Sequence, residues 1–320
     1  MIRTYRQGDR AVETADVCAA GWRLDPSVIW VDLISPTREE ELAVEAALGL
    51  SIPTREEMSE LEASSRLYRE NGAAYGIADI VQYSDTEIPT ADPVTFVLTS
   101  ERLITVRYFQ PRAFARMVER LLAEATRFTC GPEVFLELAE AIIDRLSDVL
   151  SRNASDVEAV ARRIFTEGRT AGFEALITRL GHAQIGNARI EQSLAGLARI
   201  FVFLDGDDAL EKARDGHLRL GSLARDARSL TAHAQAVAAN INFQLSAALG
   251  LINIQQSSII KIFSVASVAF LPPTLIASIY GMNFQHMPEL TQTWGYPLAI
   301  VAMILSAVLP LAYFKKRGWL

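Results

Sequence analysis

Cysteine and histidine are scarce in this chain, which has two cysteines and four histidines among 320 residues. Cys18 and Cys130 stand far apart, and no CxxC or HxxxH spacing occurs anywhere in the sequence. A disulfide framework needs several paired cysteines and a structural zinc site needs closely spaced ligands, so neither is expected. The two cysteines are predicted to be ordinary reduced thiols.

Motifs of catalysis and nucleotide binding are missing as well: the sequence has no GxGxxG, no GxxxxGK[ST] and no GxSxG. These patterns form the phosphate-binding turns and the exposed serine on which such enzymes depend. No paired catalytic constellation takes their place. We therefore expect no enzyme activity and no organic cofactor.

Basic residues are outnumbered by acidic ones, 31 to 38, which gives a formal net charge of −7. Residues 1 to 260 contain 27 basic and 37 acidic residues, a balance of about −10, because only five charged residues lie beyond them. Such a body disfavours nucleic acid as a partner and suits a cation ligand, although a solvated acidic surface is the more frequent reason.

Charge is entirely absent from Ile262–Tyr280 and from Tyr296–Phe314, two runs of 19 residues each. At about 1.5 Å per residue, each run is long enough for the roughly 30 Å hydrocarbon core of a bilayer. Two transmembrane helices are predicted, and a buried helical hairpin is the alternative.

Basic residues flank both runs on what would be one side of the membrane: Lys261, Lys315, Lys316 and Arg317. The loop Gly281–Gly295 has no lysine or arginine and carries one acid, Glu289. The positive-inside rule places the flanks in the cytoplasm and the loop outside. The starting sequence MIRTYRQGDR lacks the apolar region of a secretory signal. We expect a two-pass protein of the cell inner membrane, with its amino-terminal domain and carboxyl terminus in the cytoplasm.

Strand-like and helix-like patterns alternate over the first 110 residues. Val28–Ile34 is a β-branched apolar run that predicts a strand, and Ser35 is expected to cap a helix that begins at Pro36. Further strands are predicted within Tyr68–Tyr83 and Val94–Tyr108. This part is expected to be an α/β domain with a mixed sheet.

Helical patterns dominate after Pro111, with helices predicted at about 112–128, 133–167 and 171–204. The segment LDGDD, Leu204–Asp208, resembles the start of a calcium loop but lacks its later ligands, so a turn between helices is favoured. No proline occurs between Asp208 and Leu271, which predicts one long stalk helix entering the membrane and packing against copies of itself.

The expected domains are a cytoplasmic α/β domain (1–110), a cytoplasmic helical part (111–205), the stalk helix (206–261), a pore-lining first transmembrane helix (262–280), an outer loop (281–295), a second transmembrane helix (296–314) and a basic tail (315–320).

Small and hydroxylated residues share one face of the first membrane helix. Steps of three and four residues connect them: Ser257, Ile260, Ser264, Ser267, Leu271, Thr274 and Ser278. Such a stripe suits close packing between helices. It also suits a water-lined pore in which Ile260 and Leu271 gate by dewetting. The absence of charge within either run favours passive conduction over a proton-coupled carrier.

This stripe leads to Gly281, Met282 and Asn283. Mg2+ gives up its water ligands reluctantly, so a ring of Asn283 carbonyl oxygens from several subunits would accept hydrogen bonds from the hydrated ion. Gly281 would let the backbone turn, and Met282 would pack to hold the ring. The alternative is a helix C-cap, in which Gly and Asn adopt left-handed conformations.

Six segments resemble the CorA family of magnesium channels: IYGMNFQHMPEL, TWGYPLAI, FKKRGWL, WVDLISPT, SSRLYRENGAAYG and INIQQSSIIKIFS. The resemblance implies a homopentamer in which cytoplasmic α/β domains form a funnel and the first membrane helices line a pore. It implies that the GMN loop is the selectivity filter and that Mg2+, Co2+ and Ni2+ are transported. The partners would be further copies of the chain, divalent cations and the lipid bilayer.

Regulation by intracellular Mg2+ is also implied by the resemblance, with acidic residues of the stalk and of the neighbouring domain holding the channel closed. Asp226, in LARDARSL, is the best stalk match, and Asp79 or Asp85 lies near the expected partner. Ser257 stands where many relatives have Asn, and Ser246 where some have an acid. A zinc-transporting branch of the family and a non-conducting, membrane-anchored cation sensor are the alternative functions.

Overall fold

The computed structural model describes residues 1–9, 11–15, 22–59, 66–82, 88–167, 172–283, 287–288 and 292–318. Cys18, Asp85 and Glu289 lie outside these described residues. The chain divides into two compact units, whose ranges are Met1–Thr166 with Glu174–Leu245, and Glu167–Phe173 with Ser246–Leu320.

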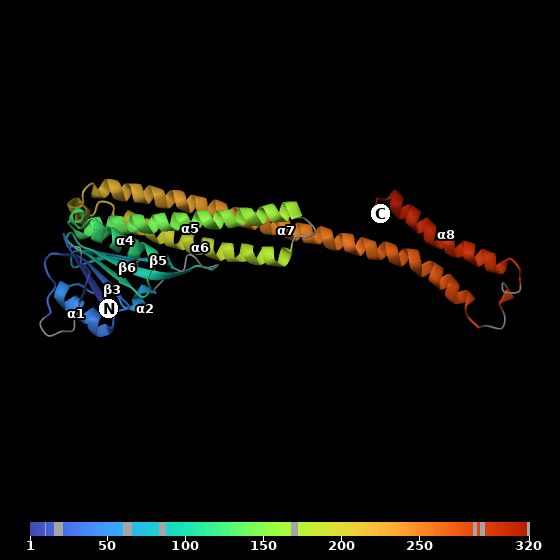
Figure 1. Cartoon of the computed structure of the whole chain (residues 1–320), viewed down its shortest axis with the longest axis horizontal. Helices are drawn as coiled ribbons and strands as arrows, with labels where there is room; N and C mark the ends of the chain where they lie inside the picture. The colour runs from blue at the N-terminus through green and yellow to red at the C-terminus, as the bar shows by residue number, and fades with distance from the viewer. Residues whose placement is uncertain are drawn as a thin grey trace. The chain divides into compact units, whose positions relative to one another are not determined.

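A seven-stranded mixed sheet forms one side of the first unit (Figure 1). Its strands are β1 (Ile2–Arg6), β2 (Glu13–Ala15), β3 (Val28–Ile34), β4 (Leu67–Glu70), β5 (Ala73–Gln82), β6 (Thr90–Leu98) and β7 (Leu103–Arg107). The order is β2-β1-β3-β7-β6-β5-β4, in which β3 and β7 are parallel and the other described pairs are antiparallel. The mixed sheet and the strand at Val28–Ile34 are confirmed, whereas β1 and β2 were not predicted.

Two short helices begin at a repeated sequence, PTREE: α1 (Arg38–Leu48) and α2 (Arg55–Met58). Thr37 and Thr54 are their N-caps, and each exchanges hydrogen bonds with the glutamate three residues later in a capping box. The predicted cap at Ser35 is wrong. Ser35 has a positive φ of 44°, and the threonine, unlike Ser35, has a glutamate at the spacing that completes the box.

Side chains cover both faces of the sheet. Val44 of α1 and Met58 of α2 are fully buried in a core cluster with alternate residues of the strands. On the other face, the Trp30 ring lies 6.2 Å from that of Phe114, and the Phe96 ring lies 5.9 Å from that of Phe135. Burial on both sides explains why the central strands are continuous apolar runs.

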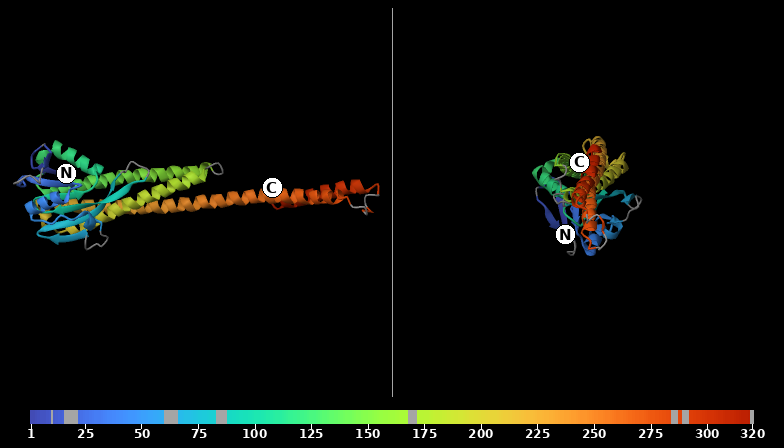
Figure 2. Two further views of the ribbon diagram at one scale, coloured as in Figure 1. Left: turned by 90° about the horizontal axis from the view of Figure 1, so that it is seen from below. Right: turned by 90° about the vertical axis from the view of Figure 1, so that its right-hand side faces the viewer.

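The helices that follow the sheet in the chain are α4 (Arg112–Ala123), the short η1 (Ala125–Arg127), α5 (Gly131–Glu167), α6 (Phe173–Leu204), η3 (Asp208–Lys212) and α7 (Gly216–Tyr280). Of these, α4, α5 and α6 contact the second face through Phe114, Phe135 and Ile200. Figures 1 and 2 show α5 and α6 running antiparallel to one another in the first unit.

The segment between α6 and α7 is a turn, as predicted for LDGDD. Asp207 Oδ1 accepts a hydrogen bond from the backbone N–H of Ala209 at 2.9 Å and caps η3. Asp215 then adopts a positive φ of 54° directly before α7. Because of these two features, the long helix begins at Gly216, ten residues after the expected residue 206.

Two helices in the second unit are long and apolar enough to cross a membrane: the carboxyl-terminal part of α7 and α8 (Gly295–Lys316). The helical assignment of α7 continues through Pro272 and Pro273. Because proline has no N–H, the carbonyl groups of Val268 and Ala269 lack their usual helical donors. Figure 1 shows α7 bending toward its carboxyl end, and α8 turning back in the opposite direction.

Candidate ion pathway

All seven residues of the predicted stripe lie on α7, spaced so that they share one face of the helix. Ile260 and Leu271 are 64% and 65% exposed, and Ser264 is half-buried while the other stripe members are exposed. Covered positions lie on the opposite side of α7, where Val265 is buried and Ala269 is half-buried. The stripe is therefore not the face of α7 that is covered within one chain.

Two hydroxyl groups of the stripe donate hydrogen bonds to the backbone of the helix itself. Ser267 Oγ donates to the carbonyl of Phe263 at 2.9 Å, and Thr274 Oγ1 donates to that of Phe270 at 2.7 Å. A hydroxyl has one proton and two lone pairs, so these oxygens present acceptors on the exposed face. Acceptors of this kind suit the water molecules that surround a cation.

The GMN segment directly follows α7. The Gly281 N–H donates to the carbonyl of Ala277 at 2.9 Å, and the Met282 N–H donates to that of Ile279 at 3.3 Å. Neither Gly281 nor Asn283 is among the described residues with positive φ, so the left-handed C-cap is not formed and Gly281 makes no left-handed turn. A Cβ atom on Gly281 would lie 3.1 Å from the Ala277 oxygen, a close approach that favours glycine.

Met282 and Asn283 are exposed at this end of α7, with 45% of Met282 accessible. Asn283 is exposed among the described residues, as a group that contacts a hydrated ion must be.

At the other end of the stripe, a pocket of about 430 Å³ is lined by Asn253, Ile254, Ser257, Ser258 and Lys261. Its polar groups are an amide, two hydroxyls and an ammonium group, and no carboxylate is among them. Neutral oxygens interact with an ion's water shell without the strong attraction that strips it. Ser257 thus lines a polar pocket beside the stripe, in which the Lys261 ammonium group would repel a cation.

The two acidic residues singled out for regulation have different surroundings. Asp226 is exposed on α7. Asp79 is buried, and its Oδ2 accepts hydrogen bonds from Arg66 at 2.8 Å and Gln192 at 2.9 Å. No group of three or more His, Cys, Asp or Glu that could hold a metal occurs among the described residues. Asp226 is therefore not part of such a group within the described part of the chain.

Aromatic and basic residues mark the ends of α8. Trp294 and Tyr296 are 77% and 78% exposed at its start. Lys315 and Lys316 lie in its last turn, and the Arg317 guanidinium is 5.7 Å from the centre of the Tyr313 ring. Exposed aromatic residues at both ends and cations at one end are typical of a membrane-spanning helix.

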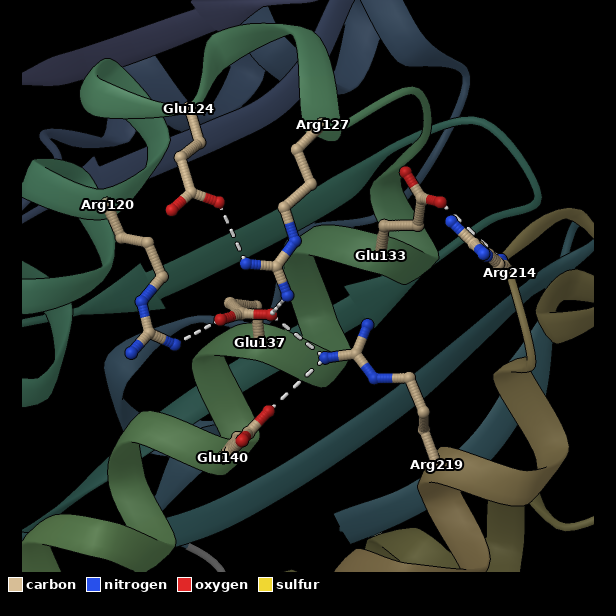
Figure 3. A network of polar contacts seen from close by, with 8 residues as sticks. All are labelled: Arg120, Glu124, Arg127, Glu133, Glu137, Glu140, Arg214 and Arg219. Carbon is tan, nitrogen blue, oxygen red and sulfur yellow. Dashed lines mark hydrogen bonds and ion pairs between the residues drawn. The ribbon is translucent and has the colours of Figure 1, made fainter.

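One buried charge cluster was not predicted from the sequence (Figure 3). Glu137 of α5 is 1% exposed and accepts hydrogen bonds from Arg120, Arg127 and Arg219. Burial alone would raise the pKa of Glu137, but the hydrogen bonds and charges of the three arginines lower it below its ordinary value. The partners are between 10 and 82 residues from Glu137 in the sequence, so no local motif reveals them.

Comparison with known proteins agrees with this architecture. A family model described as "CorA-like Mg2+ transporter protein" matches residues 25–316. The magnesium transport protein CorA of Salmonella typhimurium is 36% identical over 296 residues, which are 91% of this chain and 92% of that protein. The magnesium transport protein CorA of Escherichia coli K12 is 35% identical over 298 residues, 92% of each chain.

Solved structures share the fold. The CorA magnesium transporter from Methanocaldococcus jannaschii superimposes with a TM-score of 0.79 at 17% identity, covering 100% of this chain and 99% of that one. The full-length CmaX protein gives a TM-score of 0.73 at 17% identity, covering 100% and 98%. The sheet, the long helix and the two apolar carboxyl-terminal helices are thus common to all three, and the sequence matches identify this chain as a member of the CorA family of Mg2+ transporter proteins.

Proposed function

We propose that this chain is the subunit of a homopentameric channel that passes hydrated Mg2+, and also Co2+ and Ni2+, down the membrane potential. The observation that carries the proposal is the position of Asn283, an exposed amide directly beyond the uncovered stripe of α7. Family membership and the magnesium transport named for its relatives support Mg2+ as the substrate.

Selection at Asn283 follows from the chemistry of Mg2+. The ion holds six water ligands tightly, and an amide oxygen accepts hydrogen bonds from those waters without replacing them. One amide contacts only a small part of the shell, so several copies of Asn283 around an axis are needed to recognise it. Gly281 and Met282 complete this filter: the first keeps the backbone close to α7, and the second packs between copies.

The conduction path uses the stripe of α7. Hydroxyl acceptors at Ser264, Ser267, Thr274 and Ser278 replace bulk water around the moving ion. Ile260 and Leu271 are the apolar constrictions that close by dewetting. A unit charge gains about 2.3 kcal/mol per 100 mV, so a divalent ion entering a negative interior gains roughly twice that and needs no ATP.

Orientation and regulation complete the proposal. The basic residues Lys261, Lys315, Lys316 and Arg317 favour an inner-membrane orientation in which both flanks are cytoplasmic, and Glu289 then belongs to the outer loop. Intracellular Mg2+ bound at Asp226 and at a neighbouring copy holds the channel closed. Asp79 is a poor candidate for its partner, because it is buried and its Oδ2 already accepts hydrogen bonds from Arg66 and Gln192.

Flux of the purified protein in liposomes tests this function. The vesicles hold a Mg2+ indicator, and a potassium gradient with valinomycin sets the interior negative. The proposal predicts Mg2+ entry that grows with voltage and that excess external Zn2+ does not displace. Preferred Zn2+ entry would favour the zinc-transporting alternative, and absence of any divalent influx would favour the cation sensor.

A further inference from the structure

Glu137 is shared by three parts of the first unit. Arg120 comes from α4, Arg127 from η1 and Arg219 from the first turn of α7, and Figure 3 shows their guanidinium groups converging on one carboxylate. Arg219 Nη2 lies 2.9 Å from Glu137 Oε2 and 3.3 Å from Glu140 Oε2. One guanidinium nitrogen is thus divided between two acids that lie three residues apart on α5.

The start of α5 is fixed. A Cβ atom on Gly131 would lie 2.0 Å from the backbone of Arg102, so α5 begins directly against the turn between β6 and β7. Glu133 accepts from the Thr129 N–H at 2.7 Å and receives the Arg214 N–H at 3.4 Å from the turn before α7. The start of α5 is therefore held against the sheet, whereas its hydrogen bond to the turn before α7 is the longest of these contacts, at 3.4 Å.

Glu137 has two arginine partners besides Arg219, so its contact with Arg219 can break without leaving its charge unpaired. A buried carboxylate that loses its only cation is strongly destabilised. Glu137 keeps Arg120 and Arg127 when Arg219 leaves, so its charge stays compensated. Glu140 is 47% exposed on its side chain and can take over Arg219 without further burial of charge.

We propose that Arg219 is a positioning residue, which exchanges between Glu137 and Glu140 as the start of α7 shifts along α5, and that this exchange couples the α/β body to the pore. The same helix carries Arg219 at its start and the stripe and GMN segment at its end. The coupling to flux rests on the proposed channel function; the exchange itself does not.

Two matched substitutions test the exchange in the full-length protein in liposomes. Glu140→Gln leaves only Glu137 for Arg219, whereas Glu137→Gln leaves only Glu140. The concentration of internal Mg2+ that halves the flux is expected to shift at least threefold in opposite directions in the two variants. Arg219→Lys is expected to stay closer to wild type than Arg219→Ala, and Arg225→Ala, an exposed arginine of the same helix, is expected to match wild type.

Hydrogen exchange in residues 216–224 provides a readout that does not depend on flux. The hydrogen-exchange rate of these amides is expected to change with Mg2+ in the wild type and to be independent of Mg2+ in Arg219→Ala. This comparison still tests the inference if Glu137→Gln does not fold. The inference is overturned if the wild-type hydrogen-exchange rates are equal with and without Mg2+. It is also overturned if the half-inhibiting Mg2+ concentration shifts in the same direction in both glutamine variants. Absence of wild-type flux with Mg2+-dependent exchange overturns the channel function alone.

Discussion

The Arg66 guanidinium donates a 2.8 Å hydrogen bond to the Asp79 carboxylate, and both side chains are about nine-tenths buried. Because the pair is buried, Asp79→Ala removes a charge-assisted hydrogen bond of Arg66 and is expected to lower the free energy of unfolding by about 1.5–3 kcal/mol. Urea unfolding followed by tryptophan fluorescence measures this, since Trp30 is fully buried in the same sheet. Any folded Asp79→Ala protein is expected to keep its inhibition by Mg2+. A loss of less than 1 kcal/mol would show that Asp79 is not held as an ion pair.

Asp226 is expected to behave in the opposite way. Its side chain is exposed on α7, so Asp226→Ala is expected to change the free energy of unfolding by less than about 0.5 kcal/mol. Closure at high internal Mg2+ is expected to weaken several-fold, because the variant lacks an acidic ligand for the regulatory cation. Asp226→Glu, which keeps the carboxylate, is the control. An inhibition curve that Asp226→Ala leaves unchanged would remove this residue from the regulatory site.

Acid is expected to weaken the first unit through Glu137. Its pKa lies below the ordinary value of 4.5 despite burial, because three arginines favour the charged form. The stabilising contribution is complete above pH 4.5 and is lost as the pH falls through the lowered pKa, where the folded protein also takes up the proton. Urea unfolding at a series of pH values is expected to show a shallower pH dependence for Glu137→Gln below pH 4.5. Identical slopes for the two proteins would contradict the ion-pair account.

The proposed apolar constriction at Leu271 predicts a gain of flux when the residue is made polar. Leu271→Asn is expected to raise Mg2+ entry at high internal Mg2+ several-fold, since a polar side chain keeps the narrowest part of the pore wet. Ile262→Asn is a matched control: its side chain is 66% exposed, against 65% for Leu271, and it lies on the opposite side of α7. Equal flux from both variants would show that any polar side chain in this membrane segment raises the flux, whether or not it lies on the stripe.

Periodic and compositional signals predicted much of the fold. The strand Val28–Ile34 and the two apolar helices follow from local runs of residues that are buried on both faces or exposed to lipid. Strand β1 was missed because its place depends on pairing with β3, more than twenty residues later, and because Arg3 and Arg6 interrupt its apolar character. The start of α7 was placed too early because the cap at Asp207 and the left-handed Asp215 depend on the fold around them.

For the candidate site, helical spacing places the stripe residues on one face of α7, and chain order places the GMN segment directly after it; the roles of both stay predictions. The Glu137 cluster was missed because its members come from α4, η1, α5 and α7 and meet only after folding. Asp79 was considered as a regulatory residue because the sequence does not show that Arg66 and Gln192 bind it.

The most direct test of the account is voltage-driven Mg2+ flux through Asn283→Ala in liposomes, beside wild type and Gln292→Ala. Gln292 is a second exposed amide of the same loop, so Gln292→Ala shows whether loss of any amide there has the same effect. The account predicts that Asn283→Ala assembles like wild type but loses selective Mg2+ entry, while Gln292→Ala conducts normally. Selective Mg2+ flux retained by the assembled Asn283→Ala protein would contradict recognition of the hydrated ion at Asn283.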